Sequence, residues 1–414
     1  MGQKERICNM SYFSDQQLQG LKTPCFIIDE AELSKNFEDF KNALSREWGS
    51  NSIVAYSVKT NPHPLVLHNV KDCNCMAEVV SDDEFDLALK CGFTPSDIVF
   101  NGPCKTKVNF CNAILKHSLV NIDSNREIRW VKELSEQSEN VVKVGLRVNI
   151  DMERFCPGET IGGKEPGRFG FCFETGEAAR ALEEIQDNEN AKVVGLHLHV
   201  TTYGRKPYAY EVLAKHAVEF AAKNNIIDQI EFIDIGGGFF GGGEQNVGRY
   251  EEYASAISNV LRKVFDPFQV KLIVEPGGAV ICTPGYYVGK VLDVKNIQHK
   301  RFVVTELSRL CVDHEQKKTS YAMEIYSGSQ DVISEQRICG FTCLESDRLC
   351  VLENQVELKE DDIILIKYAG AYSWSFVPGF FISNPPTFYS YNQGKFIEYN
   401  SHLQTNAVRN GMNE

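Results

Sequence analysis

The sequence predicts an α/β fold, a parallel (β/α)₈ barrel followed by a smaller and mostly antiparallel β domain. Short apolar runs alternate with segments whose apolar residues recur at three- and four-residue spacing, which is typical of strands alternating with amphipathic helices. Eight such runs follow one another over about 230 residues, as a closed barrel requires. After Pro276 the runs are shorter and separated by Gly, Asp, Asn and Ser, which indicates a second, β-rich domain.

The alternative fold is a doubly wound parallel sheet, but it gives no reason for eight near-regular repeats. Each predicted barrel strand is a short apolar run, and the eight runs cover 53–58, 77–81, 98–102, 119–123, 143–150, 193–200, 230–235 and 271–275. Helices are predicted where apolar residues have helical spacing, at 84–90, 108–116, 177–185, 210–222 and 250–264. We therefore expect the barrel at residues 34–280.

The second domain is predicted from β-rich runs at 286–294, 301–305, 320–325, 348–351 and 362–367. A further strand, 23–29, precedes the first barrel strand. We expect this opening strand to join the C-terminal sheet. The β domain would then contain residues 1–33 and 281–414.

Composition narrows the class of protein. The chain has 414 residues, 43% of them hydrophobic and 24% charged, and a formal net charge of -13. This charge argues against nucleic acid or an anionic membrane surface as the main partner. The N-terminal residues 1–6 are polar, and no apolar run reaches the roughly 18 residues of a membrane span. We expect a cytoplasmic protein.

The fourteen cysteines do not form a recognisable framework. They are scattered through periodic segments of a large chain without an export signal, so reduced thiols are expected. Cys73-x-Cys75 and Cys339-x-x-x-Cys343 are not paired C-x-x-C units and lack a histidine pair at zinc-finger spacing. The sequence therefore predicts no metal.

Polar residues gather where the predicted barrel strands end, and this is where barrel enzymes carry their chemistry. Lys59 ends the run 53–58 and precedes Thr60-Asn61-Pro62. Taken alone, it is either a lysine that reaches solvent or an amine nucleophile that forms an imine with an aldehyde cofactor. The other strand ends carry Glu78, Ser81, Asn101, Asp123, Ser124, Arg147, Asn149, His197, His199, Asp234 and Glu275.

Three of these strand ends complement an amine nucleophile. Gly236-Gly237-Gly238 either forms a tight turn or brings backbone N–H groups close to a phosphate ester. Glu275 can hold a proton on a pyridine nitrogen. His199 can lie flat on an aromatic ring, or it is a core histidine with satisfied hydrogen bonds. Together with Lys59 they indicate a pyridoxal phosphate site.

At this point the chain resembles a known family, the fold-type III pyridoxal phosphate decarboxylases, which have an alanine-racemase-like barrel and include the diaminopimelate, ornithine and carboxynorspermidine decarboxylases. The resemblance covers nearly the whole chain. It rests on an ordered set of motifs: Tyr56-Ser57-Val58-Lys59-Thr60-Asn61-Pro62, Glu78-Val79-Val80-Ser81, Asn101-Gly102-Pro103-Cys104-Lys105, His197-Leu198-His199, Asp234-Ile235-Gly236-Gly237-Gly238, Glu275-Pro276-Gly277, Cys339-Gly340-Phe341-Thr342-Cys343 and Gly370-Ala371-Tyr372.

The resemblance implies a role for each matching residue. Lys59 would form the internal aldimine, His199 would stack on the ring and Glu275 would pair with its nitrogen. Cys343 would reach in from a partner subunit of a homodimer with shared active sites and protonate the carbanion. The implied cofactor-binding residues are Lys59, His199, Thr202, Gly236, Gly237, Gly238, Glu275, Gly277, Gly278 and Tyr372.

Several positions depart from the family pattern. The family's Glu-Pro-Gly-Arg has Gly278 at the arginine position, and the His-x-Gly-Ser stretch reads His199-Val200-Thr201-Thr202. Leu344 follows the cysteine, with Glu345 one place later, and residues 304–309 replace an Asp-Ala-Gly-like stretch. The segment 152–168 is glycine-rich and charged, and it is either a substrate-facing lid or a solvated loop. Candidate substrate contacts are Arg147, Arg168, Glu345 and Asp347.

The resemblance implies decarboxylation of the α-carboxylate of an amino acid. Because of the departures, the substrate stays open among a diamino acid, a carboxylated polyamine and a specialised intermediate, as in polyamine or siderophore biosynthesis. An amino-acid racemase on the related barrel is the second hypothesis, although no tyrosine motif for its second base is found. The third is a non-catalytic homologue that binds a protein partner, but such a protein would lose Lys59 or Cys343, and both are present.

Overall fold

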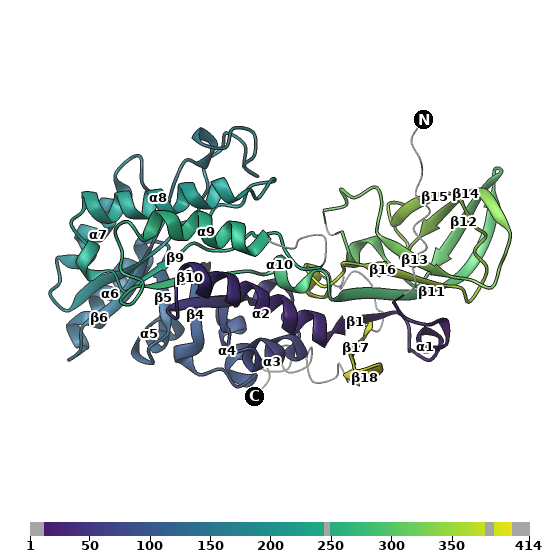
Figure 1. Cartoon of the computed structure of the whole chain (residues 1–414), viewed down its shortest axis with the longest axis horizontal. Helices are drawn as coiled ribbons and strands as arrows, with labels where there is room; N and C mark the ends of the chain where they lie inside the picture. Colours follow the sequence, from purple (N-terminus) through teal and green to yellow (C-terminus); the bar gives the residue numbers. More distant parts are fainter. Residues whose placement is uncertain (1–11, 244–248, 314, 377–384, 400–414) are drawn as a thin grey trace. The chain divides into compact units, whose positions relative to one another are not determined.

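The computed structural model describes residues 12–243, 249–313, 315–376 and 385–399. The chain forms two compact units, one of residues 30–283 and one of residues 1–29 with 284–414 (Figure 1). Among the described residues, no helix is long and apolar enough to cross a membrane.

The unit of residues 30–283 is a closed barrel of eight parallel strands, which confirms the predicted fold. The ring runs in the order β5-β4-β3-β2-β10-β9-β8-β6 and closes where β5 pairs with β6. A ninth, two-residue strand, β7 (Phe171–Cys172), extends the ring beyond the end of β6. The barrel strands are β2 (Ser52–Ser57), β3 (Met76–Ser81), β4 (Ile98–Cys104), β5 (Leu119–Ile122), β6 (Val142–Asn149), β8 (Ala191–His197), β9 (Phe232–Asp234) and β10 (Lys271–Val274).

Helices follow the strands and surround the ring (Figure 1). Several begin at capping residues that come directly after a strand: the Ser81 side chain accepts from Glu84 N–H, and the Thr106 side chain accepts from Asn109 N–H. The helices are α2 (Glu30–Glu47), α3 (Pro64–Asp72), α4 (Asp82–Lys90), α5 (Lys107–Leu115), α6 (Asn125–Gln137), α7 (Glu177–Gln186), α8 (Pro207–Lys223), α9 (Arg249–Leu261) and the short α10 (Gly278–Ile281).

The two ends of the barrel interior differ in polarity. Toward the amino ends of the strands, the Phe232 ring packs with Ala55, Val99, Val194 and Ile273. Gly195 in β8 makes room for this ring, because a Cβ there would collide with it. At the carboxyl ends the buried residues are charged or polar: Glu78, Asn101, His197, Asp234 and Glu275.

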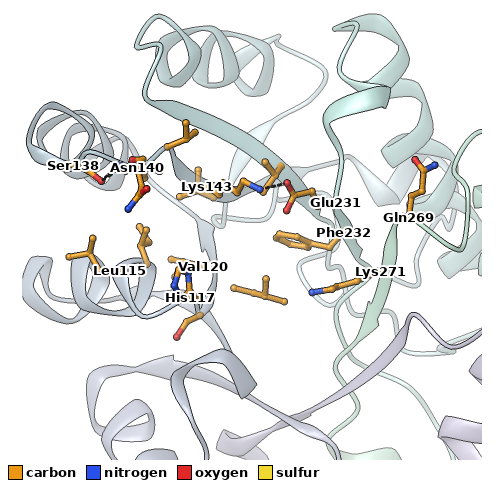
Figure 2. Close-up of a pocket in the computed structure, with 17 residues that line it drawn as sticks. Leu115, His117, Val120, Ser138, Asn140, Lys143, Glu231, Phe232, Gln269 and Lys271 are labelled. Carbon is orange, nitrogen blue, oxygen red and sulfur yellow. Dashed lines mark hydrogen bonds and ion pairs between the residues drawn. The ribbon is translucent and has the colours of Figure 1, made fainter.

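A cavity of about 770 Å³ also lies at the amino ends of the strands, with Lys143, Glu231, Phe232 and Lys271 among its lining residues (Figure 2). Two of its charged groups are paired at the surface, since Lys143 Nζ lies 2.5 Å from Glu231 Oε1 and both side chains are about half exposed. Barrel chemistry occurs at the opposite, carboxyl ends of the strands. The active site is therefore expected at the carboxyl ends of the strands and not in this cavity.

The second unit contains the mostly antiparallel sheet. In it β1 (Cys25–Asp29) lies between β11 (Gly285–Ile297), with which it is antiparallel, and β17 (Thr387–Asn392), with which it is parallel. The remaining strands are β12 (Lys300–Thr305), β13 (Met323–Tyr326), β14 (Val332–Cys339), β15 (Arg348–Val356), β16 (Ile363–Lys367) and β18 (Lys395–Tyr399). Phe13, Leu18 of α1 (Asp15–Gln19) and Ile27 belong to its apolar core.

Candidate active site

Lys59 lies in a single 3-10 turn, Val58–Thr60, at the end of β2. Its amine donates to Ser57 Oγ at 2.7 Å and contacts Glu78 Oε2 at 2.9 Å. The lysine side chain is 43% exposed, whereas that of Glu78 is 2% exposed. The amine therefore stands at the border between a buried carboxylate and the space beyond the strand ends.

Glu78, in β3, is held in its ionised form. Burial acts to raise its pKa, but the charge of Lys59 and hydrogen bonds from Ser57, Lys59 and Asn101 outweigh this, so the pKa lies below its usual value. Ser57 Oγ donates to Glu78 Oε2 at 2.7 Å, and Asn101 Nδ2 donates to Oε1 at 3.2 Å. Glu78 is thus a carboxylate that neutralises Lys59.

Asp234 is the last residue of β9, and Glu275 directly follows β10. Their carboxyl groups form a pair that carries a proton. Burial raises the pKa of Asp234 to about 7. Burial, together with the charges of Asp234 and Glu78, raises the pKa of Glu275 well above its usual range. The two carboxyl groups are hydrogen-bonded to each other, and the Asn101 amide also contacts Glu275 Oε1. Such a pair can hold one proton between its oxygens.

Two histidines lie beside these acids, and both are neutral. Burial, followed by the charge of Arg147, lowers the pKa of His199 to about 3. Its Nδ1 accepts from Gly237 N–H at 3.0 Å. His197 Nε2 lies 3.8 Å from Glu275 Oε2, but burial lowers the pKa of His197 well below its usual value. The two side chains are therefore not an ion pair.

The glycine loop after β9 brings its backbone close to His199 and Glu275. Gly236 and Gly238 have φ values of 69° and 85°, a region that glycine adopts readily. A Cβ at Gly236 would lie 2.5 Å from the His199 Cβ, and one at Gly237 would collide with the Glu275 carbonyl oxygen. The loop therefore needs glycine on both conformational and steric grounds.

His197, Asp234 and Glu275 each offer a ligand atom within 4.8 Å of the others, an arrangement that could hold a cation. The raised pKa values of both carboxyl groups favour a shared proton in this triad. Asn121 Nδ2 and Gly236 N–H also occupy both Asp234 oxygens, at 3.3 and 2.9 Å. We interpret the triad as part of the polar floor of the site.

Arg147, at the end of β6, is ion-paired with Asp123 at 2.8 Å. The Phe169 ring contacts two guanidinium groups, that of Arg147 at 4.7 Å and that of Arg168 at 4.1 Å. Residues from segment 152–168 and His199 line a cavity of about 580 Å³. The segment therefore borders a space that reaches the imidazole, while its role as a lid stays a prediction.

Thr202 and Gly277 lie close to other site residues within the barrel unit. Thr202 is buried, and its hydroxyl accepts from Arg205 N–H at 3.1 Å. Gly277 precedes α10, and a Cβ there would collide with Thr60 Oγ1. Gly278 is the first residue of α10. The structure thus brings together, in one unit, all the barrel residues proposed for cofactor binding.

The remaining predicted site residues lie in the other unit. The Cys343 side chain is exposed, and Tyr372 is 40% exposed. Glu345 is exposed and pairs with Arg348 at 2.7 Å. Asp347 is buried and accepts hydrogen bonds that hold its own loop, from Ser308 Oγ, Arg309 N–H and Thr342 Oγ1. Asp347 thus has a structural role in the β unit.

Sequence reasoning missed two residues of this site, namely Ser57 and Asn121. Ser57 bridges Lys59 and Glu78. Asn121 Nδ2 donates to Asn101 Oδ1 at 2.8 Å, and Lys105 Nζ donates to the Asn121 carbonyl at 3.1 Å. The available signal was a polar residue inside an otherwise apolar strand, as in Leu119-Val120-Asn121-Ile122.

Comparison with known families identifies the chain. The family model described as "Pyridoxal-dependent decarboxylase, pyridoxal binding domain" matches residues 30–282, more than half of the chain. The chain belongs to the pyridoxal-dependent decarboxylases. It is an amino-acid carboxy-lyase, and its cofactor is pyridoxal phosphate.

Individual relatives agree with this family. The enzyme is 26% identical to a diaminopimelate decarboxylase of Zymomonas mobilis, covering 84% of this chain and 83% of the relative. It is also 26% identical to the diaminopimelate decarboxylase of Methanocaldococcus jannaschii, covering 85% and 82%. The crystal structure of a diaminopimelate decarboxylase from M. jannaschii has a TM-score of 0.80 at 22% identity, covering 92% of this chain and 90% of that one. At this identity the structural likeness shows the fold.

The residues of the barrel fit pyridoxal phosphate. Gly236 and Gly237 are buried and donate their N–H groups to Asp234 and His199, whereas Gly238 is only partly buried and its N–H can serve an anion such as a phosphate. His199 is neutral, and Glu275 can carry a proton to a ring nitrogen. The partly exposed Lys59 amine can reach an aldehyde. These donors and acceptors match the parts of the cofactor, from its phosphate to its aldehyde.

Proposed function

We propose that this enzyme removes the α-carboxylate of a diamino acid, with Lys59 as the residue that binds the cofactor covalently. The observation that carries the proposal is the position of the Lys59 amine. It is paired with the ionised Glu78 in the same barrel mouth as a neutral His199 and a protonated Glu275. Diaminopimelate decarboxylases among the relatives support a diamino acid.

Each residue of the mouth has a role that follows from its charge. Bound pyridoxal phosphate supplies an electron sink for the two electrons that remain when carbon dioxide leaves. Glu275 holds a proton where the ring nitrogen needs one, so that the sink is stronger. Glu78 neutralises the positive charge of Lys59, and His199 offers a flat, uncharged face. In the glycine loop, Gly236 and Gly237 already donate their N–H groups to Asp234 and His199, so the Gly238 N–H is the loop amide that would help to seat the phosphate.

We further propose that Cys343 of the partner subunit returns the proton to the α-carbon, in a two-fold homodimer with shared sites. The family resemblance and the exposed thiol support this role. A two-fold arrangement completes two sites with one self-complementary surface.

The relatives indicate the class of substrate only in part, because this chain departs from the family motifs at several positions. Gly278 replaces an arginine of the family motif, Leu344 follows Cys343, and residues 304–309 differ from the diaminopimelate pattern. The phosphate must therefore depend more on backbone amides and Tyr372. A diamino acid is the first class to test, and a carboxylated polyamine is the second.

The decisive experiment measures carbon dioxide released from a panel of diamino acids and carboxylated polyamines by the purified enzyme. Borohydride reduction should attach the cofactor irreversibly, and peptide mass spectrometry should find it on Lys59. Release from a diamino acid together with label on Lys59 is the expected result. Label on another lysine, or release only from substrates with one amine, would contradict the proposal.

The shared site is tested by mixing Lys59→Ala and Cys343→Ala enzymes, each inactive alone, under conditions that exchange subunits. A heterodimer then contains one complete site. Activity should recover to about a quarter of wild type for equal amounts and random exchange. If exchange is demonstrated by mass and no activity returns, both residues belong to the same subunit's site.

A further inference from the structure

A continuous row of hydrogen-bonded polar side chains crosses the carboxyl ends of the barrel strands. It begins at Lys59, whose amine contacts Glu78 Oε2 at 2.9 Å. Glu78 Oε1 accepts from Asn101 Nδ2 at 3.2 Å, and the same nitrogen donates to Glu275 Oε1. Glu275 is hydrogen-bonded to Asp234. The Asn101 amide nitrogen therefore links Glu78, which neutralises Lys59, to the Glu275–Asp234 pair at the ends of β10 and β9.

A second asparagine fixes the orientation of the Asn101 amide. Asn121 Nδ2 donates to Asn101 Oδ1 at 2.8 Å and to Asp234 Oδ2 at 3.3 Å. Because Asn101 Oδ1 is an acceptor here, Asn101 Nδ2 must point toward the two carboxyl groups. Gly145 in β6 makes space for Asn121, since a Cβ there would collide with the Asn121 side chain. Three strands thus hold one amide in one orientation.

The orientation of Asn101 decides which carboxyl oxygens can carry a proton. An amide nitrogen only donates, so the oxygens that it contacts on Glu78 and Glu275 must be unprotonated. The remaining place for the proton of Glu275 is Oε2 or the hydrogen bond with Asp234, away from Glu78. The opposite pKa shifts of Glu78 and Glu275, downward and upward, agree with this arrangement.

We propose that Asn101 is a positioning residue that keeps Glu78 ionised beside Lys59 and keeps a proton on the pair of Glu275 and Asp234. It acts through these carboxyl groups. The proposal rests on the proposed function, because the two protonation states matter for catalysis only when Lys59 and Glu275 both act on the cofactor.

Asn101→Asp tests the proposal, because it preserves the shape of the side chain and replaces the donor with an acceptor. In the holoenzyme we expect the pH titration of the cofactor's visible absorbance to move upward by about one pH unit, since an added negative charge favours the cationic form of the lysine-bound group. The charged and titratable groups that face the row are Lys59, Glu78, Glu84, Lys105, Arg147, His197, His199, Asp234 and Glu275.

The rate constant kcat of Asn101→Asp should fall on the order of tenfold to a hundredfold, while KM changes less than about threefold. Asn51→Asp is the matched control. Asn51 precedes β2 at the other end of the barrel and donates to the Pro267 carbonyl at 2.9 Å. The control receives the same chemical change and should leave the titration unchanged.

Asn101→Ala, which removes the donor without adding charge, provides a second variant if the aspartate variant does not fold. It should lower kcat with a smaller spectral shift. A wild-type titration and kcat in a folded Asn101 variant, or an equal shift in Asn51→Asp, would overturn the proposal. If the wild-type enzyme carries no borohydride label on Lys59, the proposed function fails instead, so the two failures are distinguishable.

Discussion

The barrel contains two lysine–glutamate pairs that have similar distances and differ in the exposure of the lysine. Lys59 contacts Glu78 at 2.9 Å, and Lys105 contacts Glu127 at 3.1 Å. The Lys105 side chain is 0% exposed, whereas that of Lys59 is 43% exposed. Lys105 also donates to the carbonyls of Gly102 and Asn121, at 2.6 and 3.1 Å. Its three protons therefore have three acceptors inside the protein.

This difference in exposure indicates a structural role for Lys105 and leaves Lys59 accessible for its proposed chemical role. Lys105 is sealed in the barrel wall, where it joins the end of β4 to α6 through Glu127, whose second oxygen accepts from Asp123 N–H at 2.7 Å. Burial lowers the pKa of Lys105 even though Glu127 opposes this shift. The Lys59 side chain is partly exposed, so a small molecule can reach its amine. A carboxylate at a similar distance thus pairs with a sealed lysine in one place and with an accessible lysine, the proposed nucleophile, in the other.

The largest expected difference between variants of Lys59 and Lys105 is in enzymatic activity. Lys59→Ala should lower the rate of carbon dioxide release by at least about a thousandfold, because it removes the proposed nucleophile. Its free energy of unfolding should change less than in a Lys105 variant, since Glu78 keeps hydrogen bonds from Ser57 and Asn101. Steady-state kinetics and urea unfolding of the same preparations measure both. Substantial turnover by Lys59→Ala would assign the chemistry to another group.

For Lys105→Met we expect a larger loss of stability than for Lys59→Ala and a smaller loss of activity. It leaves Glu127 buried without a counter-charge, and breaking such a pair costs about 3–5 kcal/mol. The loss should appear as a lower urea midpoint. Lys105→Met combined with Glu127→Leu should recover part of the stability, because no unpaired charge remains. If the single variant were as stable as wild type, the pair would not be the structural one.

Much of the barrel and its chemistry could be predicted from the sequence, because both follow simple periodicities. Buried parallel strands have nearly continuous apolar sequences, and their carboxyl ends lie at the same end of the barrel. This rule selected Lys59, His199 and Glu275 as candidate site residues, and all three lie in the barrel unit, while their roles stay predictions. The strand β14 was not predicted, because its exposed face is polar and the buried Gln336 bonds to the backbone of Val356 and Leu358.

The polar side chains inside the strands were harder to predict. A single serine or asparagine in an apolar run does not show which residue it will meet, because its partner comes from another strand. Ser57 meets Glu78 of β3, and Asn121 meets Asn101 of β4. Cys343 and Tyr372 were assigned by resemblance alone, since an exposed thiol or phenol carries no periodic signal. Their roles stay predictions.

The Ser57 hydroxyl should support the Lys59–Glu78 pair. Ser57→Ala removes hydrogen bonds to both Lys59 and Glu78, each at 2.7 Å, and should destabilise the protein by about 1–2 kcal/mol. We expect kcat to fall about tenfold, because the amine is less well placed. Ser258→Ala is the control, since among the described residues its buried hydroxyl has no hydrogen-bond partner. A similar loss of kcat in both variants would show a general effect of burial.

The smallest expected effect concerns the acid stability that the Lys59–Glu78 pair contributes. The pKa of Glu78 is lowered in the folded protein, so its contribution to stability is present above the unfolded value of about 4.5 and is lost as pH falls through the folded value. Glu78→Gln lacks this contribution. The difference in unfolding free energy between wild type and variant should therefore shrink by on the order of 1 kcal/mol as pH falls from 7 to below 4.5. Urea unfolding at several pH values measures it. A difference that grew with acidity would mean that Glu78 is protonated in the folded enzyme and does not neutralise Lys59.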